Sequence, residues 1–193
     1  MPENNTDYKL PFNENTPVQF SDEILKKLKQ IISRYPEGRQ KSAMLPVLHI
    51  AQEELGGYLS VEIMDYVAGL LQVEPIEVYE VATFYSQYYL EKVGKYVIEV
   101  CHTGPCAICG SETISEYLQE KLKIGVGETT ADGFFTLKEV ECLGACGSAP
   151  VMQINTEFYE NLTEQGIDQL LGELKNRTNH SKPNEAKWAE KFF

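Results

Sequence analysis

The chain has 193 residues, enough for one medium domain or two small ones, and 42% of them are hydrophobic, which allows a packed core. Asp and Glu number 29 against 17 Lys and Arg, and the resulting net charge of -12 argues against binding to a nucleic-acid backbone. No apolar run reaches the length of about 18 residues that a membrane-spanning helix needs, so we expect no direct membrane insertion. The first residues lack the pattern of a signal peptide, and we expect a protein that stays in a reducing cytoplasm.

Four helical patterns fill the first half of the chain. The first begins at Ser21 and the third at Ser60, both good N-cap residues, and the fourth enters through Pro75, which favours a first turn. Apolar residues recur at helical spacing in each pattern, and the fourth continues to Leu90. Helices joined by such short connections predict a small helical bundle over residues 21–92.

Nothing in this half of the sequence suggests a catalytic site. His49 lies within the second helical pattern, and we interpret it as a structural or surface histidine. An aromatic run in the fourth pattern predicts core packing, and an exposed subset of it would be suited to anchor a partner subunit. Its members are Tyr79, Phe84, Tyr85, Tyr88 and Tyr89.

The second half of the chain alternates between strands and helices. Strand patterns end at Cys101 and Cys142, and helical patterns begin at Ser111 and Thr163, which we expect to be their N-caps. The order β-α-β-β-(β)-α is typical of a thioredoxin-like layout, so we predict an α+β protein in which a small N-terminal helical bundle precedes a thioredoxin-like α/β domain. A polar tail with Trp188 is either a loosely ordered end or a docking segment. The predicted division is an irregular lead-in at 1–20, the bundle at 21–92, the thioredoxin-like domain at 93–175 and the tail at 176–193.

All five cysteines lie between positions 101 and 146. Cys101, Cys106 and Cys109 form the pattern C-x4-C-x2-C, and Cys142 and Cys146 form C-x3-C. Thiolates grouped in this way bind soft metals. The predicted layout ends two strands at one edge of the sheet, so both cysteine loops can converge on one cluster.

Four kinds of cysteine chemistry are conceivable for this pattern. Disulfides are disfavoured because the cysteine count is odd and no secretory context is present. A closed zinc site built from two close cysteine pairs leaves Cys101 unused. A redox dithiol at Cys106 and Cys109 fits a C-x-x-C between a strand and a helix, but it leaves three cysteines unexplained. An iron–sulfur site of the [2Fe–2S] type uses four of the five and is the interpretation that we favour.

Two sets of four ligands are open to such a site. The plant-type pattern takes Cys101, Cys106, Cys109 and Cys142. The alternative takes the pairs Cys101/Cys106 and Cys142/Cys146, and the layout favours it because each loop then supplies two thiolates to one iron.

The paired cysteines resemble those of the thioredoxin-like [2Fe–2S] ferredoxin subunits of respiratory complex I, the counterparts of the mitochondrial small flavoprotein-fraction subunit. The phrases ECLGAC at 141–146, APV at 149–151 and VYEVATFY at 78–85 carry the resemblance, which extends over about residues 20–175. The family implies a thioredoxin-like [2Fe–2S] ferredoxin domain holding one [2Fe–2S] cluster, and it assigns no role to Cys109. The implied ligands are Cys101, Cys106, Cys142 and Cys146.

The resemblance also implies a function and a set of partners. It implies a one-electron carrier, an oxidoreductase subunit of NADH:quinone oxidoreductase, beside a flavoprotein that holds FMN and a further iron–sulfur cluster. The larger complex would be membrane-bound and respiratory, with this subunit in its cytoplasmic peripheral arm. Relatives in NAD-linked hydrogenases and formate dehydrogenases leave an equivalent diaphorase role open. The chain has no G-x-G-x-x-G, so we assign the hydride chemistry to the flavoprotein.

Overall fold

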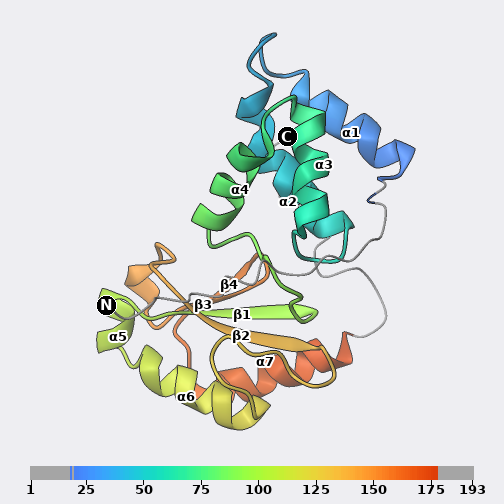
Figure 1. Ribbon diagram of the computed structural model, residues 1–193. Coiled ribbons are helices and arrows are strands. Elements are labelled where there is room, and N and C mark those ends of the chain that lie inside the picture. Colours follow the sequence, from blue (N-terminus) through green and yellow to red (C-terminus); the bar gives the residue numbers. More distant parts are fainter. Residues whose placement is uncertain (1–17, 19, 178–193) are drawn as a thin grey trace, which may run out of the picture. The chain divides into compact units, whose positions relative to one another are not determined.

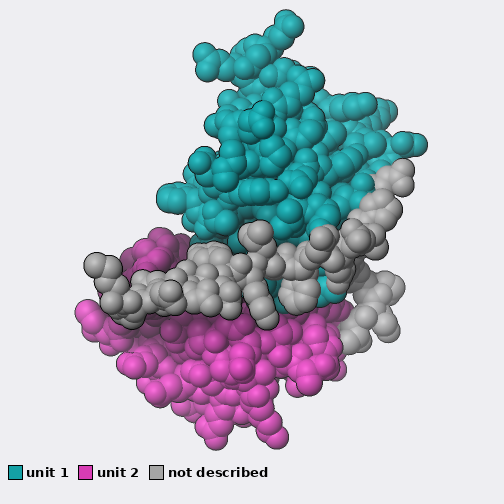
Figure 2. Space-filling model, viewed as in Figure 1, with its two compact units in different colours: residues 1–92 teal, residues 93–193 magenta. Residues whose placement is uncertain are grey.

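The computed structural model describes residue 18 and residues 20–177 (Figure 1). The chain divides into two compact units, residues 1–92 and residues 93–193 (Figure 2). The predicted lead-in falls largely outside the described residues, and so does the tail beyond residue 177 with Trp188. Within the described ranges, no helix combines the length and the apolar character needed to cross a bilayer.

The first unit is helical. Ser21 and Ser60 cap their helices as predicted, because each side chain accepts a hydrogen bond from the backbone N–H three residues later. Pro75 begins the fourth α-helix, also as predicted. The elements of the unit are α1 (Asp22–Ile32), the 3-10 turn η1 (Gln40–Ala43), α2 (Met44–Glu54), α3 (Val61–Leu71) and α4 (Pro75–Phe84).

Helix α4 is shorter than the sequence predicts, because it ends at Phe84 and not at Leu90. The next residue, Tyr85, has an extended backbone. The side chain of Gln52, on α2, instead forms hydrogen bonds with the backbone that follows α4. The carbonyl of Gln52 accepts the N–H of Tyr89 at 2.7 Å, and its amide donates to the carbonyl of Gln87 at 3.1 Å. These tertiary bonds replace the next helical turn.

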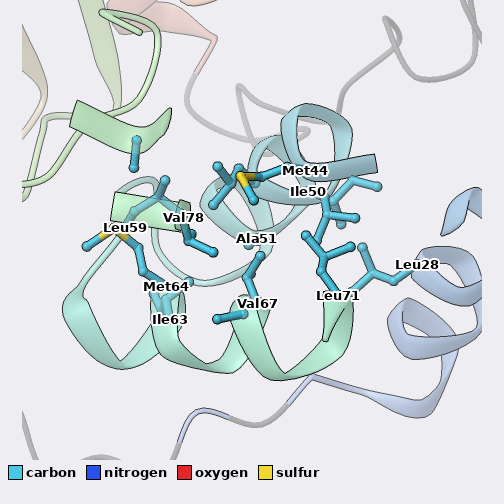
Figure 3. Close-up of a cluster of buried hydrophobic side chains, with 14 of the residues drawn as sticks. Leu28, Met44, Ile50, Ala51, Leu59, Ile63, Met64, Val67, Leu71 and Val78 are labelled. Carbon is cyan, nitrogen blue, oxygen red and sulfur yellow. The ribbon is translucent and has the colours of Figure 1, made fainter. Parts of the chain in front are cut away.

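The helices of the first unit enclose one apolar core (Figure 3). Side chains from α1, α2, α3 and α4 point toward one another in it, and the central ones are fully buried. Burial of apolar surface is the main favourable term in folding, so this core is what holds the bundle together. Residues with no exposed surface at all include Leu28, Val47, Leu48, Val67 and Val78.

The second unit is built on a four-stranded sheet with the order β2-β1-β3-β4 (Figure 1). Strand β1 pairs in parallel with β2 and antiparallel with β3, and β3 and β4 form an antiparallel hairpin. The elements are β1 (Tyr96–Cys101), α5 (Gly104–Ile108), α6 (Ser111–Leu122), β2 (Phe135–Val140), the 3-10 turn η2 (Cys146–Ser148), β3 (Met152–Ile154), β4 (Glu157–Tyr159) and α7 (Glu164–Asn176).

Helices α6 and α7 cover one face of this sheet. Tyr96, Ile98 and Val100 alternate along β1 and lie in one apolar cluster with Leu118 of α6 and Leu174 of α7. Thr163 caps α7, as predicted, by accepting a hydrogen bond from the N–H of a residue in its first turn. The order and pairing of these elements agree with the predicted thioredoxin-like layout.

Candidate metal centre

The two cysteine loops leave the sheet at the same edge. Cys101 is the last residue of β1 and lies in register with Val140, the last residue of the parallel strand β2. The N–H of His102 donates to the carbonyl of Val140 at 3.2 Å, so the two loops begin side by side. Cys142 lies two residues after Val140, in the second loop. The convergence predicted from the sequence is therefore a consequence of the parallel pairing.

The first cysteine pair is buried. Cys101 and Cys106 are each 2% exposed, and both pack with Val151. Cys106 lies on the short helix α5, which the sequence did not predict, and its N–H donates to the carbonyl of Thr103 at 3.0 Å. Apolar residues of the second loop complete this small cluster, namely Leu143, Ala145 and Ala149.

The second cysteine pair faces solvent. Cys142 and Cys146 are both exposed, and their Sγ atoms are 4.0 Å apart. The N–H of Gly144 donates to Cys142 Sγ at 3.4 Å. Gly144 has a φ of +78°, a conformation that residues with a side chain rarely adopt, so glycine lets the loop turn its N–H toward the sulfur.

Contacts across the loops link the two pairs. Burial by itself raises the pKa of the Cys101 thiol, but hydrogen bonds from Thr103 and from the N–H of Leu143 outweigh it and hold the pKa below its usual value. Burial and the neighbouring Cys101 raise the pKa of Cys106. Cys142 raises the pKa of Cys146, to which Cys101 adds a smaller effect. Cys101 therefore raises the pKa of one thiol in each pair, Cys106 and Cys146.

Cys109 differs from the other four cysteines. It is exposed at the C-cap of α5, where its N–H donates to the carbonyl of Pro105 at 2.9 Å. In residues 20–177, no hydrogen bond joins its sulfur to another cysteine. The dithiol hypothesis pairs this exposed thiol with the buried Cys106, whose contacts are instead with Cys101 and Val151.

The donor set has the composition that a [2Fe–2S] cluster needs. Among the residues that the structure describes, no three His, Cys, Asp or Glu side chains are grouped to hold one metal ion. A binuclear cluster needs two thiolates at each iron, because bridging sulfides complete the coordination. Two cysteine pairs at one sheet edge, with backbone N–H groups directed at their sulfurs, have the chemistry of such a site.

One further contact between the loops was not predicted. His102 Nε2 lies 3.7 Å from Glu141 Oε1, and each residue is the sequence neighbour of a cysteine. Both side chains are substantially exposed, so the pair contributes little to stability. The sequence carried no signal for it, because the contact depends on the register of β1 and β2.

Comparison with known proteins decides the family. The family model of the thioredoxin-like [2Fe–2S] ferredoxin matches residues 28–175. The chain belongs to this family. The predicted family, the α+β fold with a thioredoxin-like domain and the single [2Fe–2S] cofactor are thereby confirmed.

Curated relatives of this ferredoxin cover most of the chain. It is 46% identical over 162 residues to the E subunit of the NADH-quinone oxidoreductase of Rickettsia felis, covering 84% of this chain and 97% of the relative. It is 45% identical over 164 residues to the mitochondrial NADH dehydrogenase [ubiquinone] flavoprotein 2 of Dictyostelium discoideum, covering 85% of this chain and 66% of the relative.

A solved structure shares the fold. A chain of an NAD+-reducing [NiFe]-hydrogenase in the air-oxidized state matches with a TM-score of 0.60 and 21% identity. The match covers 70% of this ferredoxin but only 23% of the hydrogenase chain. At that identity, the likeness concerns the fold alone.

Proposed function

We propose that this ferredoxin is the one-electron carrier subunit of an NADH:quinone oxidoreductase, and that Cys101, Cys106, Cys142 and Cys146 hold its [2Fe–2S] cluster. One observation carries the proposal. Two cysteine pairs converge at one sheet edge in a chain that is 46% identical to a protein named as the E subunit of an NADH-quinone oxidoreductase.

When bound, a [2Fe–2S] cluster supplies one-electron chemistry without hydride transfer. The residues of the chain bind the cluster, exclude water from it and stabilise its charge. Cys101 and Cys106 would hold the cluster with their buried thiolates, where Val151 and the apolar residues of the second loop exclude water. Cys142 and Cys146 would complete its coordination from the exposed loop, where an electron partner can approach. The N–H of Gly144 offsets negative charge on the sulfur of Cys142.

The partner in this proposal is a flavoprotein subunit that carries FMN and an iron–sulfur cluster. This ferredoxin has no dinucleotide-binding G-x-G-x-x-G in its sequence, so a partner must exchange electrons with NADH. The helical bundle offers a docking surface for it at the end of α4. Phe84 is 79% exposed and Tyr85 is 41% exposed, and their rings meet edge to face with centroids 5.0 Å apart. Exposed aromatic pairs are typical interface anchors. The proposed location is the cytoplasmic peripheral arm of the membrane-bound complex.

The proposal is tested by reduction with NADH under anaerobic conditions. The ferredoxin is mixed with NADH alone, with the FMN-bearing subunit alone, and with both, and each sample is frozen for EPR spectroscopy. We expect the signal of a reduced [2Fe–2S] centre in this ferredoxin only when NADH and the flavoprotein are both present. Reduction by NADH alone, or no reduction with both components, would contradict the proposal.

A second candidate role comes from the sequence resemblance, which extends to subunits of NAD-linked hydrogenases and formate dehydrogenases. In that case the ferredoxin serves the equivalent diaphorase part of a hydrogenase or of an NAD-linked formate dehydrogenase. Affinity purification of the tagged chain from its own cells separates these roles. A quinone-reducing complex with NADH activity supports the first, and hydrogen- or formate-dependent reduction of NAD+ supports the second.

A further inference from the structure

Thr103 is the N-cap residue of α5, but its side chain does not cap the helix. Within residues 20–177, three other helices have hydroxyl N-caps, at Ser21, Ser60 and Thr163, and each of these accepts a hydrogen bond from a backbone N–H in its own helix. The hydroxyl of Thr103 lies instead 3.6 Å from Cys101 Sγ, within hydrogen-bonding distance for sulfur. Thr103 therefore has the position of a helix cap, but its hydroxyl contacts the sulfur of Cys101 and not a backbone N–H of α5.

The direction of this hydrogen bond follows from the chemistry of Cys101. A cysteine that ligates iron is a thiolate and carries no proton, so the one proton available between the two atoms belongs to the hydroxyl of Thr103. Cys101 is 2% exposed, so water cannot freely replace this donor. The backbone N–H groups of Thr103 and Leu143 act as further donors that lower the pKa of this thiol. Thr103 therefore contributes the only side-chain hydroxyl among these donors.

We propose that the hydroxyl of Thr103 is a positioning group that sets the reduction potential of the centre through Cys101. The inference rests on the proposed function, because it requires a [2Fe–2S] cluster on the four cysteines. Reduction moves one electron from the donor to the site and makes one ferric iron ferrous, with no covalent bond formed or broken. The added negative charge spreads to the thiolate sulfurs, so a donor at Cys101 Sγ stabilises the reduced form more than the oxidised form. The donor thus raises the potential.

The size of the effect follows from the worth of one hydrogen bond. A hydrogen bond that is stronger by about 1 kcal/mol in the reduced form than in the oxidised form changes the ratio of reduced to oxidised protein about fivefold at a fixed potential. For one electron, a tenfold change corresponds to about 59 mV, so we expect the potential to fall by about 40 mV when the hydroxyl is removed.

The experiment is an EPR-monitored redox titration of the whole chain, with dithionite as the reductant. Thr103→Val removes the hydroxyl and keeps the shape of the side chain, and Thr103→Ser keeps the hydroxyl. Thr113→Val is the matched control, because Thr113 is exposed on α6. We expect a lower potential for Thr103→Val alone. If Thr103→Val does not assemble the centre, Thr103→Ala replaces it, with the same expectation.

The outcomes separate the two proposals. Wild-type protein without iron and sulfide would overturn the proposed function and this inference with it. A wild-type centre whose potential is unchanged in Thr103→Val would overturn the inference alone. An equal fall in Thr103→Val and Thr103→Ser would also overturn it, because the hydroxyl, which Thr103→Ser keeps, could not then be responsible.

Discussion

The helical bundle and the cysteine end of the sheet use their side chains in opposite ways. In the bundle, apolar residues such as Leu48 and Val67 are completely buried, and the hydroxyl caps at Ser21 and Ser60 serve their own helices. At the cysteine end, two of the four proposed ligands are exposed, and backbone N–H groups donate to sulfur. The bundle is thus organised for stability and the cysteine end for binding a cofactor, so mutations should separate the two properties.

A ligand substitution should have the largest effect, and it should be confined to the cysteine end. We expect Cys146→Ser to lose or alter the cluster, because it removes one thiolate from the exposed pair. Cys109→Ser is the control and should keep the cluster, because Cys109 lies outside both pairs. Iron and acid-labile sulfide per chain measure the result. The reverse outcome would establish the plant-type ligand set that includes Cys109.

A core substitution should have the next largest effect, and it should act through the bundle. Leu48 on α2 has no exposed surface, so Leu48→Ala leaves a cavity and should lower the free energy of unfolding by about 2–5 kcal/mol. Leu45 on the same helix is 37% exposed, and Leu45→Ala should cost about 1 kcal/mol or less. Urea denaturation measures both. Equal losses for the two variants would show that burial in α2 does not determine stability.

The pH dependence of the bundle should be smaller and should have a defined sign. Burial lowers the pKa of His49 to about 4, whereas the unfolded chain has its ordinary value of about 6.5. Between these values the unfolded state binds a proton and the folded state does not, so stability is complete above pH 6.5 and falls as the pH drops toward 4. We expect a contribution of about 2 kcal/mol to be lost between pH 7 and pH 5.

Urea denaturation at the two pH values measures this contribution. The comparison of wild type with His49→Gln removes the effects of the other titrating groups, since glutamine does not bind a proton in this range. The variant should lose less stability than the wild type on acidification. Equal losses would mean that His49 remains accessible to protons in the folded bundle.

The smallest effect concerns a helix cap and sharpens the contrast with Thr103. The side chain of Thr163 accepts the N–H of Gly166 at 3.1 Å, so Thr163→Ala should lower the free energy of unfolding by about 1 kcal/mol. Thr163→Ser should restore most of this loss. Neither variant should change the reduction potential, since this hydroxyl accepts a backbone N–H of α7 and does not contact a cysteine sulfur. A changed potential would show that cap stability and the redox site are coupled.

The parts of the fold that could be predicted from the sequence are local. Ser21, Ser60 and Thr163 act within one helical turn, so each was identified as a cap from its neighbours alone. Ser111 was expected to cap α6, but the structure gives that position to Gly110, which has a φ of +92°, and buries Ser111 inside the helix. Neighbouring residues did not distinguish these two candidates.

The features that could not be predicted depend on distant contacts. Helix α4 ends early because Gln52, on another helix, binds the backbone of the aromatic run. The convergence of the cysteine loops was predicted, since parallel strands end at one edge. The unequal burial of the two pairs was not, because it depends on the packing of Leu143 and Val151 against Cys101 and Cys106.

The central claim is that two cysteine pairs hold one [2Fe–2S] centre, and the most direct test is chemical. Iron and acid-labile sulfide are measured on protein purified without oxygen, with an EPR spectrum at low temperature after dithionite reduction. The account predicts about two irons and two sulfides per chain and a single S = 1/2 signal. Protein that contains neither iron nor sulfide after anaerobic reconstitution would contradict it, and zinc or a Cys106/Cys109 dithiol would then be the remaining interpretations.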